Sequence, residues 1–167
     1  MSCTNVDDGS CEYAVDCAGV CGGSAEVDDC GECGGDGSSC GGENVPNWED
    51  DPGGYALTAT IVGGIVLSDG EPLAESGDIF AAFDDVGNVR GMAVSLTPPF
   101  GPHAGEIIYE MTIRSNASGE LISFKYYDAS NDIVLDIVET YEFSTNEQVG
   151  SMITPQFYTI FIALTGT

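Results

Sequence analysis

The stretch Glu106–Arg114, "EIIYEMTIR", carries the alternation of a β-strand with one buried face. Ile107, Tyr109, Met111 and Ile113 fall on every second position, and most of the positions between them are polar or charged. Successive side chains of a strand point to opposite faces of a sheet, so this period of two predicts a strand whose apolar face covers a core.

The same pattern recurs along the chain after residue 55. "GELISFKYYD" (119–128) and "NDIVLDIVE" (131–139) alternate in the same way, and the flanking "NASG" and "DASND" have turn chemistry. Further strand candidates span residues 55–62, 64–70, 78–85, 88–96, 139–143 and 156–164. Eight or nine strands with short connections and no helical pattern predict an all-β fold, and we expect an antiparallel Ig-like β-sandwich.

The composition divides the chain into parts. Residues 41–54, "GGENVPNWEDDPGG", are rich in Gly, Pro and acids, a composition typical of linkers. We predict an irregular, disulfide-stapled Cys/Gly/Asp-rich segment over 1–43, a linker over 44–54 and a β-sandwich domain over 55–167.

The charge balance limits the partners. The chain has 28 acidic and 3 basic residues, for a formal net charge of −25. It should repel nucleic acid and anionic membrane surfaces, and it lacks a run of about 18 apolar residues, so we expect neither nucleic-acid binding nor membrane insertion. Because like charge opposes compaction, we expect divalent cations to stabilise the protein. The N-terminal "MSCTNVDD" lacks the pattern of a signal peptide, which predicts a mature or truncated chain.

All seven cysteines lie in the first 40 residues. They are Cys3, Cys11, Cys17, Cys21, Cys30, Cys33 and Cys40. Clustering of this kind predicts disulfides formed in an oxidising compartment, with a pairing that the spacing does not reveal. Seven is odd, so full oxidation leaves one cysteine to pair between chains or with a segment outside this sequence.

Two other roles for the cysteines are weaker. Cys30 and Cys33 have the CxxC spacing of redox sites, but the carboxylates around them disfavour the reactive thiolate. A zinc site made from Cys17, Cys21, Cys30 and Cys33 would carry negative charge that no nearby Lys or Arg offsets. Disulfides are therefore the favoured interpretation.

Four acidic residues of the Cys-rich segment are candidate calcium ligands. Asp16, Asp28, Asp29 and Asp36 lie in Gly-rich turns, where carbonyl oxygens can join carboxylates around a hard cation. The DxDxDG loop of an EF-hand is absent, and solvated turn residues are the alternative. Calcium is the cofactor that this pattern predicts.

Catalytic constellations are missing from the sequence, so we do not expect an enzyme. The single histidine, His103, lies in a Pro/Gly loop without a neighbouring cysteine or a nucleophile elbow. Arg90 is predicted to be a partly buried partner of an acid such as Asp78 or Asp84. Asn116 begins an N-x-S sequon in an expected turn and is a candidate glycosylation site.

The last strand candidate differs from the others. "QFYTIFIALTGT" (156–167) is apolar on both faces. It fits either a central strand buried on both sides or a strand shared with a neighbouring subunit, because an exposed apolar edge would otherwise invite aggregation. The candidate assembly residues are Phe157, Tyr158, Ile160, Phe161, Ile162 and Leu164.

The N-terminal part resembles a known family of repeats. Residues 7–40, in which "DCAGVCGG" (16–23) is echoed by "DCGECGG" (29–35), resemble a Cys/Gly/Asp repeat found in arrays on secreted bacterial proteins. The end of this stretch, "CGECGGDGSSC", is similar to a motif in the cysteine-rich regions of extracellular metalloproteases. The resemblance implies disulfides and calcium in a stalk or spacer.

The β-rich part is similar to a β-sandwich module repeated on bacterial secreted and cell-surface proteins. The similarity rests on "GDIFAAFDDVGNVRGMAV" (77–94), "SGELISFKYYDAS" (118–130), "YEFSTNEQVGS" (141–151) and Pro155. It implies an extracellular, non-enzymatic role. A single copy behind a short repeat looks more like a subunit of an extracellular fibril or pilus.

We therefore expect a secreted structural subunit that polymerises with copies of itself, head to tail, into an acidic extracellular filament. The contacts would come from a neighbour's N-terminal extension, from an exchanged strand over 155–164, or from both, stabilised by disulfides and divalent cations. The alternative is a carbohydrate-binding or adhesion module of a cell-surface protein, which would contact glycans through Trp48, Tyr126, Tyr127 and Tyr158.

Overall fold

The computed structural model describes residues 15–27, 33–34 and 42–161. The chain divides into two compact units, Met1–Gly42 and Glu43–Thr167. The structured part of the second unit is built from strands and turns. Within the residues that the structure describes, no helix is long and apolar enough to cross a membrane.

The second unit contains nine strands over its described residues. They are β1 (Leu57–Ser68), β2 (Glu71–Pro72), β3 (Ile79–Phe83), β4 (Val89–Leu96), β5 (Ile108–Ser115), β6 (Leu121–Asp128), β7 (Ile133–Glu142), β8 (Gln148–Val149) and β9 (Gln156–Thr159). The predicted all-β class and strand number are confirmed.

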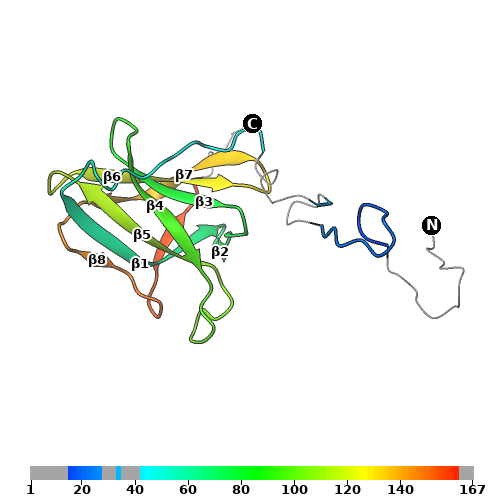
Figure 1. Cartoon of the computed structure of the whole chain (residues 1–167). Helices are drawn as coiled ribbons and strands as arrows, with labels where there is room; N and C mark the ends of the chain where they lie inside the picture. Colours follow the sequence, from blue (N-terminus) through cyan, green and yellow to red (C-terminus); the bar gives the residue numbers. More distant parts are fainter. Residues whose placement is uncertain (1–14, 28–32, 35–41, 162–167) are drawn as a thin grey trace, which may run out of the picture. The chain divides into compact units, whose positions relative to one another are not determined.

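The strands form one curled sheet in the order β2-β1-β5-β4-β3-β6-β7. β4 pairs with β5 on one side and with β3 on the other, so β3, β6 and β7 lie across from β1 and β5 (Figure 1). All pairings along this path are antiparallel, but β8 and β9 both run parallel to β1. This mixed topology does not confirm the expected Ig-like arrangement.

The two ends of the curled sheet meet at a single bridge. Ile160, which follows β9, pairs with Ile137 of β7 in the antiparallel sense. The Phe161 N–H donates to the Asp136 carbonyl oxygen at 2.7 Å. The chain therefore passes from the edge of β1 to the edge of β7 within a few residues.

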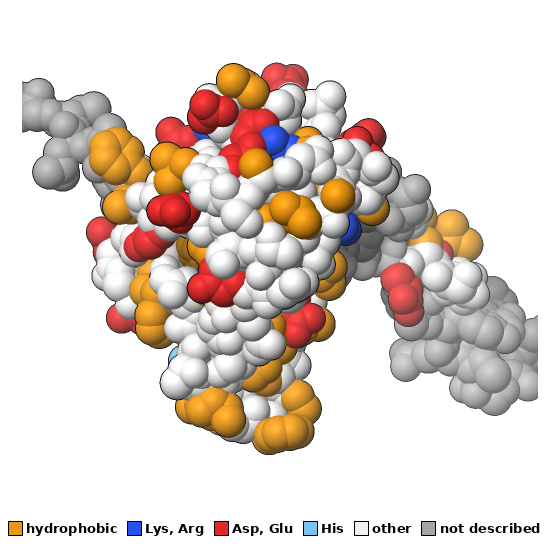
Figure 2. Space-filling model, turned by 90° about the vertical axis from the view of Figure 1, so that its left-hand side faces the viewer, with side chains coloured by type: hydrophobic (Ala, Val, Ile, Leu, Met, Phe, Trp, Pro, Cys, Tyr) orange, Lys and Arg blue, Asp and Glu red, His pale blue; other side chains and the backbone are white. Residues whose placement is uncertain are grey.

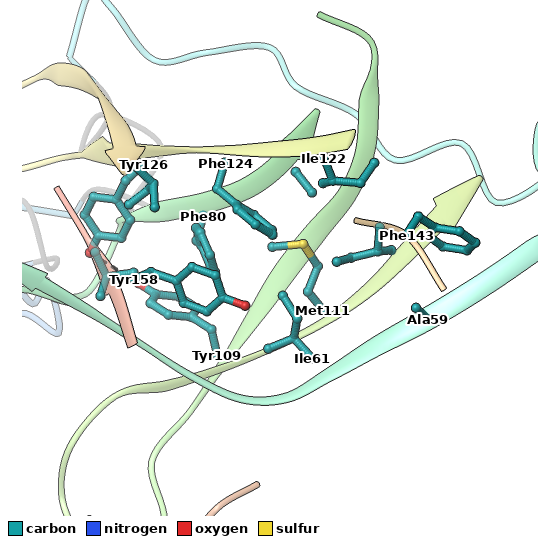
Figure 3. Close-up of a cluster of buried hydrophobic side chains, with 14 of the residues drawn as sticks. Ala59, Ile61, Phe80, Tyr109, Met111, Ile122, Phe124, Tyr126, Phe143 and Tyr158 are labelled. Atoms are coloured by element: carbon teal, nitrogen blue, oxygen red, sulfur yellow. Dashed lines mark hydrogen bonds between the residues drawn. The ribbon is translucent and has the colours of Figure 1, made fainter. Parts of the chain in front are cut away.

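Aromatic side chains fill the space inside the curl (Figure 3). The ring of Phe80 lies 5.5 Å from the ring of Tyr109, 5.6 Å from that of Phe124 and 5.0 Å from that of Tyr158. Large rings bury the most apolar area per residue, so this cluster is the main source of stability.

The alternation predicted for β5 and β6 is confirmed by burial. The inward positions Tyr109, Met111, Ile113, Ile122, Phe124 and Tyr126 are all at most 2% exposed. The expected strands 55–62 and 64–70 form the single strand β1, and residues 133–142 likewise form one strand, β7. The sequence pattern predicted two strands in each place because Gly63–Gly64 and Glu139 interrupt the alternation of apolar residues.

Gly63 explains why β1 continues without a break. A Cβ at this position would lie 2.3 Å from the carbonyl oxygen of Ser151. A Cβ on Gly150, which has a φ of 72°, would lie 2.5 Å from the Gly63 carbonyl oxygen. The glycines therefore let the segment between β8 and β9 run directly against β1, and the β1–β5 pairing absorbs the irregularity as a bulge.

The stretch predicted as a linker belongs to the second unit, where it lies against the sheet. Asn44 donates from its backbone and side-chain nitrogens to the Asp132 carboxylate at 3.1 and 3.0 Å. Asp50 accepts two hydrogen bonds from Arg114, each at 3.0 Å. The Trp48 ring meets a buried phenylalanine edge-to-face. These contacts fix the stretch as a strap of this unit.

Candidate assembly surface

The outer face of β9 is the candidate assembly surface. Tyr158 and Ile160 point into the core and are 3% and 5% exposed, whereas Phe157 and Phe161 point outward and are 46% and 57% exposed. The interpretation of a strand buried on both sides is therefore wrong for the described residues. Ile162 and Leu164 lie outside the described residues.

A seam runs between β9 and β7 next to this surface. Glu139 of β7 accepts a hydrogen bond from the Thr159 backbone N–H at 2.6 Å. Burial raises the pKa of Tyr158, and the nearby charge of Glu139 raises it further. A small hollow of about 110 Å³ opens here, with Phe124 at its floor. The seam is thus closed by one bridge and one side chain rather than by a full ladder of hydrogen bonds.

The N-terminal unit contains a disulfide between Cys17 and Cys33, with 5.4 Å between their Cα atoms. Cys21 is disulfide-bonded as well. The Cys17–Cys33 bond removes two thiolates from the alternative zinc set and one from the CxxC pair, so neither alternative fits this structure. The other predicted disulfide residues, Cys3, Cys11, Cys30 and Cys40, lie outside the described residues.

The disulfide joins the two halves of the internal repeat. Val15 bridges to Cys21 and Val27 bridges to Cys33, each in the antiparallel sense over the same spacing. Gly22 and Gly34, which follow the bridging cysteines, both have a positive φ. The first half therefore makes a small hairpin, the second half repeats its bridge over the same spacing, and glycine permits the positive φ that follows each bridge.

Asp16 organises the hairpin that the Val15–Cys21 bridge closes. Its Oδ1 accepts hydrogen bonds from the backbone N–H of Ala18 at 3.1 Å and of Val20 at 2.8 Å, and its Oδ2 accepts one from Ala25 at 3.3 Å. Both carboxylate oxygens thus already serve the backbone. Across the described ranges, no three acidic, cysteine or histidine side chains gather as a metal site would require. The other predicted ligands, Asp28, Asp29 and Asp36, lie outside these ranges, and calcium stays a prediction.

Arg90 has the buried acidic partner that was predicted. Its Nη2 lies 3.1 Å from Asp84 and 2.6 Å from Glu120, and its guanidinium stacks over the Tyr55 ring at 4.2 Å. Asp78 is not its partner, because that carboxylate accepts hydrogen bonds from Tyr126 and from the Ala129 backbone N–H. This network joins three segments of the unit and has no reacting group in it.

The tyrosines expected to contact sugars are inside the protein. Tyr126, Tyr127 and Tyr158 are 0%, 1% and 3% exposed, so their rings cannot stack on a ligand. The Trp48 ring is half-buried against Phe83, with 5.0 Å between the ring centroids. The expectation of an exposed aromatic platform is wrong for the three tyrosines.

Asn116 lies in the turn between β5 and β6, as the sequon suggested. Its Oδ1 accepts from the Ala56 N–H at 2.9 Å, and its Nδ2 donates to the Gly54 carbonyl oxygen at 3.2 Å. The side chain therefore ties the strap to the sheet, and glycosylation of this residue stays a prediction. His103 forms a 2.8 Å contact with Glu106 inside its own loop.

The sequence interpretation missed Phe100. This ring is 82% exposed in the loop between β4 and β5. A signal was present, because residues 86–105 contain no acid in a chain of 28 acids. Residues 148–167, which include β9, are the other acid-free run of 20 residues.

Comparison with protein-family models, with curated proteins and with solved structures gives no match. Fold and surface together define a class in plain terms. The chain joins a disulfide-stapled repeat to a curled all-β unit with an apolar outer strand face.

Proposed function

We propose that this protein is the structural subunit of an extracellular filament and that it binds copies of itself through β9 and the chain that follows. The observation that carries the proposal is the outward position of Phe157 and Phe161 on a segment whose other face is core. When a partner covers apolar side chains on an outer strand, the burial of their surface lowers the free energy of the assembly.

The distribution of charge supports the same surface. Residues 148–167 contain no acid, although the chain carries a net charge of −25. This run adds no carboxylate of its own to a contact, and the acids that border it, Asp136 and Glu139, belong to the neighbouring strand β7. The remaining acids would keep neighbouring filaments apart and so favour single fibres over bundles.

The N-terminal unit suits a spacer or clamp in such a filament. Its repeat is stapled by a disulfide, and disulfides persist in oxidising, extracellular surroundings. Its predicted role is to bridge to a neighbouring subunit, with calcium offsetting its acids. Head-to-tail growth would then use this extension, the C-terminal strand, or both.

The alternative of a carbohydrate-binding module has less support. Its proposed contact residues Tyr126, Tyr127 and Tyr158 are buried. Adhesion through a filament of this protein remains compatible with a structural role and needs no sugar site on the subunit.

Sedimentation and negative-stain electron microscopy of the full oxidised chain, with calcium and physiological salt, test the proposal. We expect fibres whose formation needs a roughly 10- to 100-fold higher concentration in Phe157→Asp, the range that follows from losing one buried aromatic contact. Leu121→Asp is the matched control, because Leu121 is also exposed (56%) and the substitution adds the same charge. A monodisperse wild-type monomer at high concentration would refute the filament.

A chelator separates the role of calcium from that of the strand. Removing divalent cations should loosen residues 15–27 in hydrogen exchange if the N-terminal unit binds calcium. Unchanged protection there would leave the disulfides as the only staple and would not affect the test on Phe157.

A further inference from the structure

The loop between β4 and β5 holds an aromatic side chain out into solvent. Phe100 is 82% exposed, more than any other large apolar residue of the described chain. Prolines at 98, 99 and 102 flank it. A single exposed aromatic on a stiff loop is the kind of residue that dominates binding energy in protein interfaces.

Hydrogen bonds fix this loop in place. The Gly105 N–H donates to the Pro98 carbonyl oxygen at 3.0 Å, and the Glu106 N–H donates to the His103 carbonyl oxygen at 3.2 Å. The Glu106 carboxylate also contacts the His103 ring at 2.8 Å. Since the loop is already ordered, docking Phe100 would cost little conformational entropy.

The loop and β9 share a rare electrostatic property. They lie in the two acid-free runs of 20 residues, 86–105 and 148–167. Figure 2 shows the result: hydrophobic side chains gather at the lower tip, below the pale-blue histidine, without carboxylates among them. Each run also exposes more than one apolar side chain, with Val94 at 63% in the first and Ile153 at 72% in the second.

We propose that the Phe100 loop of one copy docks on the outer face of β9 of the next copy, over Phe157. This inference rests on the proposed self-assembly and names its two surfaces. A second copy is the fitting occupant because it brings a loop segment without acids to a strand segment without acids, in a chain whose net charge of −25 opposes most other contacts between copies. An anionic membrane would instead be repelled by the acids elsewhere on the unit.

The contact is heterologous, since the loop and the strand are different surfaces of one subunit. Among the described residues of one copy nothing covers either surface, since Phe100 is 82% and Phe157 46% exposed. Each copy can therefore bind one neighbour through its loop and another through its strand, and such contacts add subunits without limit unless they close a ring. A contact of loop with loop, or of strand with strand, would stop at dimers.

Mixing two full-length variants tests this pairing. Phe100→Asp keeps the strand surface and Phe157→Asp keeps the loop surface, so each alone should remain monomeric at the lowest concentration at which the wild type forms fibres, which lies below the raised threshold of the variants. An equal mixture should form a 1:1 dimer and nothing larger, because only one intact contact exists between the two. Sedimentation velocity would show twice the monomer mass in the mixture, and the double variant should stay monomeric with either partner.

The controls separate this inference from the proposed function. Leu121→Asp should assemble like the wild type, and all variants should unfold at the wild-type denaturant concentration because the replaced side chains are exposed. Wild-type chains that never associate would refute the filament itself. Three results would overturn the loop contact: fibres from Phe100→Asp, a mixture that stays monomeric, or binding to anionic vesicles that Phe100→Asp abolishes. The first two results would not contradict the filament itself.

Discussion

Asp84 shows how a carboxylate can be buried at low cost. It is 5% exposed and accepts hydrogen bonds from the backbone of Val86 and from the backbone and side chain of Asn88, at 2.8–3.1 Å. Burial acts to raise the pKa of Asp84, but these hydrogen bonds and the charge of Arg90 outweigh it and hold the pKa below its ordinary value. The residue therefore stabilises the fold in its charged form.

Asp84→Asn should lower the free energy of unfolding by about 3 kcal/mol, because it removes one partner of a buried pair while Arg90 keeps Glu120. Denaturant unfolding at neutral pH measures the loss. The depressed pKa means that Asp84 contributes stability above its unfolded value of 3.8 and loses it as the pH falls further. The difference between wild type and variant should therefore shrink in acid.

Asp85→Asn is the matched control for this substitution. Asp85 is the next residue in the same turn but is exposed. We expect a change within about 0.5 kcal/mol. Equal effects at both positions would show that the turn, and not the buried pair, matters.

Buried tyrosines predict a limit of stability at high pH. Burial raises the pKa of Tyr109 to about 12 and raises the pKa of Tyr126 and Tyr158 as well. A raised pKa gives stability that is complete below the unfolded value of 10.0 and is lost as the pH rises through the folded value. Phenolate absorbance from these residues should appear together with loss of the fold. Free titration of all seven tyrosines near 10.0 would contradict their burial.

At the scale of elements, the contact between β1 and the chain after β8 depends on a missing side chain. Gly63→Ala would place its Cβ against the Ser151 backbone, where neither strand can yield easily. Overpacking of this kind costs about 1–3 kcal/mol, and we expect the loss to show in denaturant unfolding. Gly53→Ala is the control, since the nearest heavy atom to its Cβ would be 3.7 Å away. Equal stability of the two variants would mean that β8 and β9 can move off β1.

The strands that alternate cleanly could be predicted from the sequence, and those set by distant partners could not. β5 and β6 have their apolar faces inward as expected, because local period decides the face of a half-buried strand. The parallel pairing of β9 with β1 depends instead on Gly63 and Gly64, about 90 residues earlier in the chain.

The tyrosines show the same division between local and distant information. The carbohydrate-binding alternative needed Tyr126 to be exposed, but the ring is buried and Asp78, 48 residues away, accepts a hydrogen bond from its hydroxyl. Tyr127 is buried because Asp132 accepts its hydrogen bond at 2.8 Å. Burial of a polar ring depends on such a partner, and the partner is known only once the sheet is assembled.

At the scale of the whole molecule, the two units should respond separately to reduction. Every cysteine lies before residue 41, so a reductant has no direct target in Glu43–Thr167. Trp48 is the only tryptophan and its ring contacts Phe83, so its fluorescence follows the second unit alone. Reduction should change the free energy of unfolding measured by this fluorescence by less than about 0.5 kcal/mol.

Hydrogen exchange provides the complementary measurement on the first unit. A disulfide that closes a loop of this size contributes about 3 kcal/mol in the chain-entropy model, so reduction should remove protection from residues 15–27. If reduction lowered the denaturant midpoint of the unfolding transition followed by Trp48 fluorescence, the first unit would instead be shown to stabilise the second.

The Cys17–Cys33 bond also has a mechanical consequence. The two cysteines are 16 residues apart along the chain, but their Cα atoms are 5.4 Å apart. A pulling force crosses the disulfide instead of stretching the loop, which when fully drawn out would span roughly 55 Å. In a thread of such subunits this loop would not lengthen while oxidised, and it would release about 50 Å of slack in each subunit when reduced. Its elasticity would thus be set by the redox state of its surroundings.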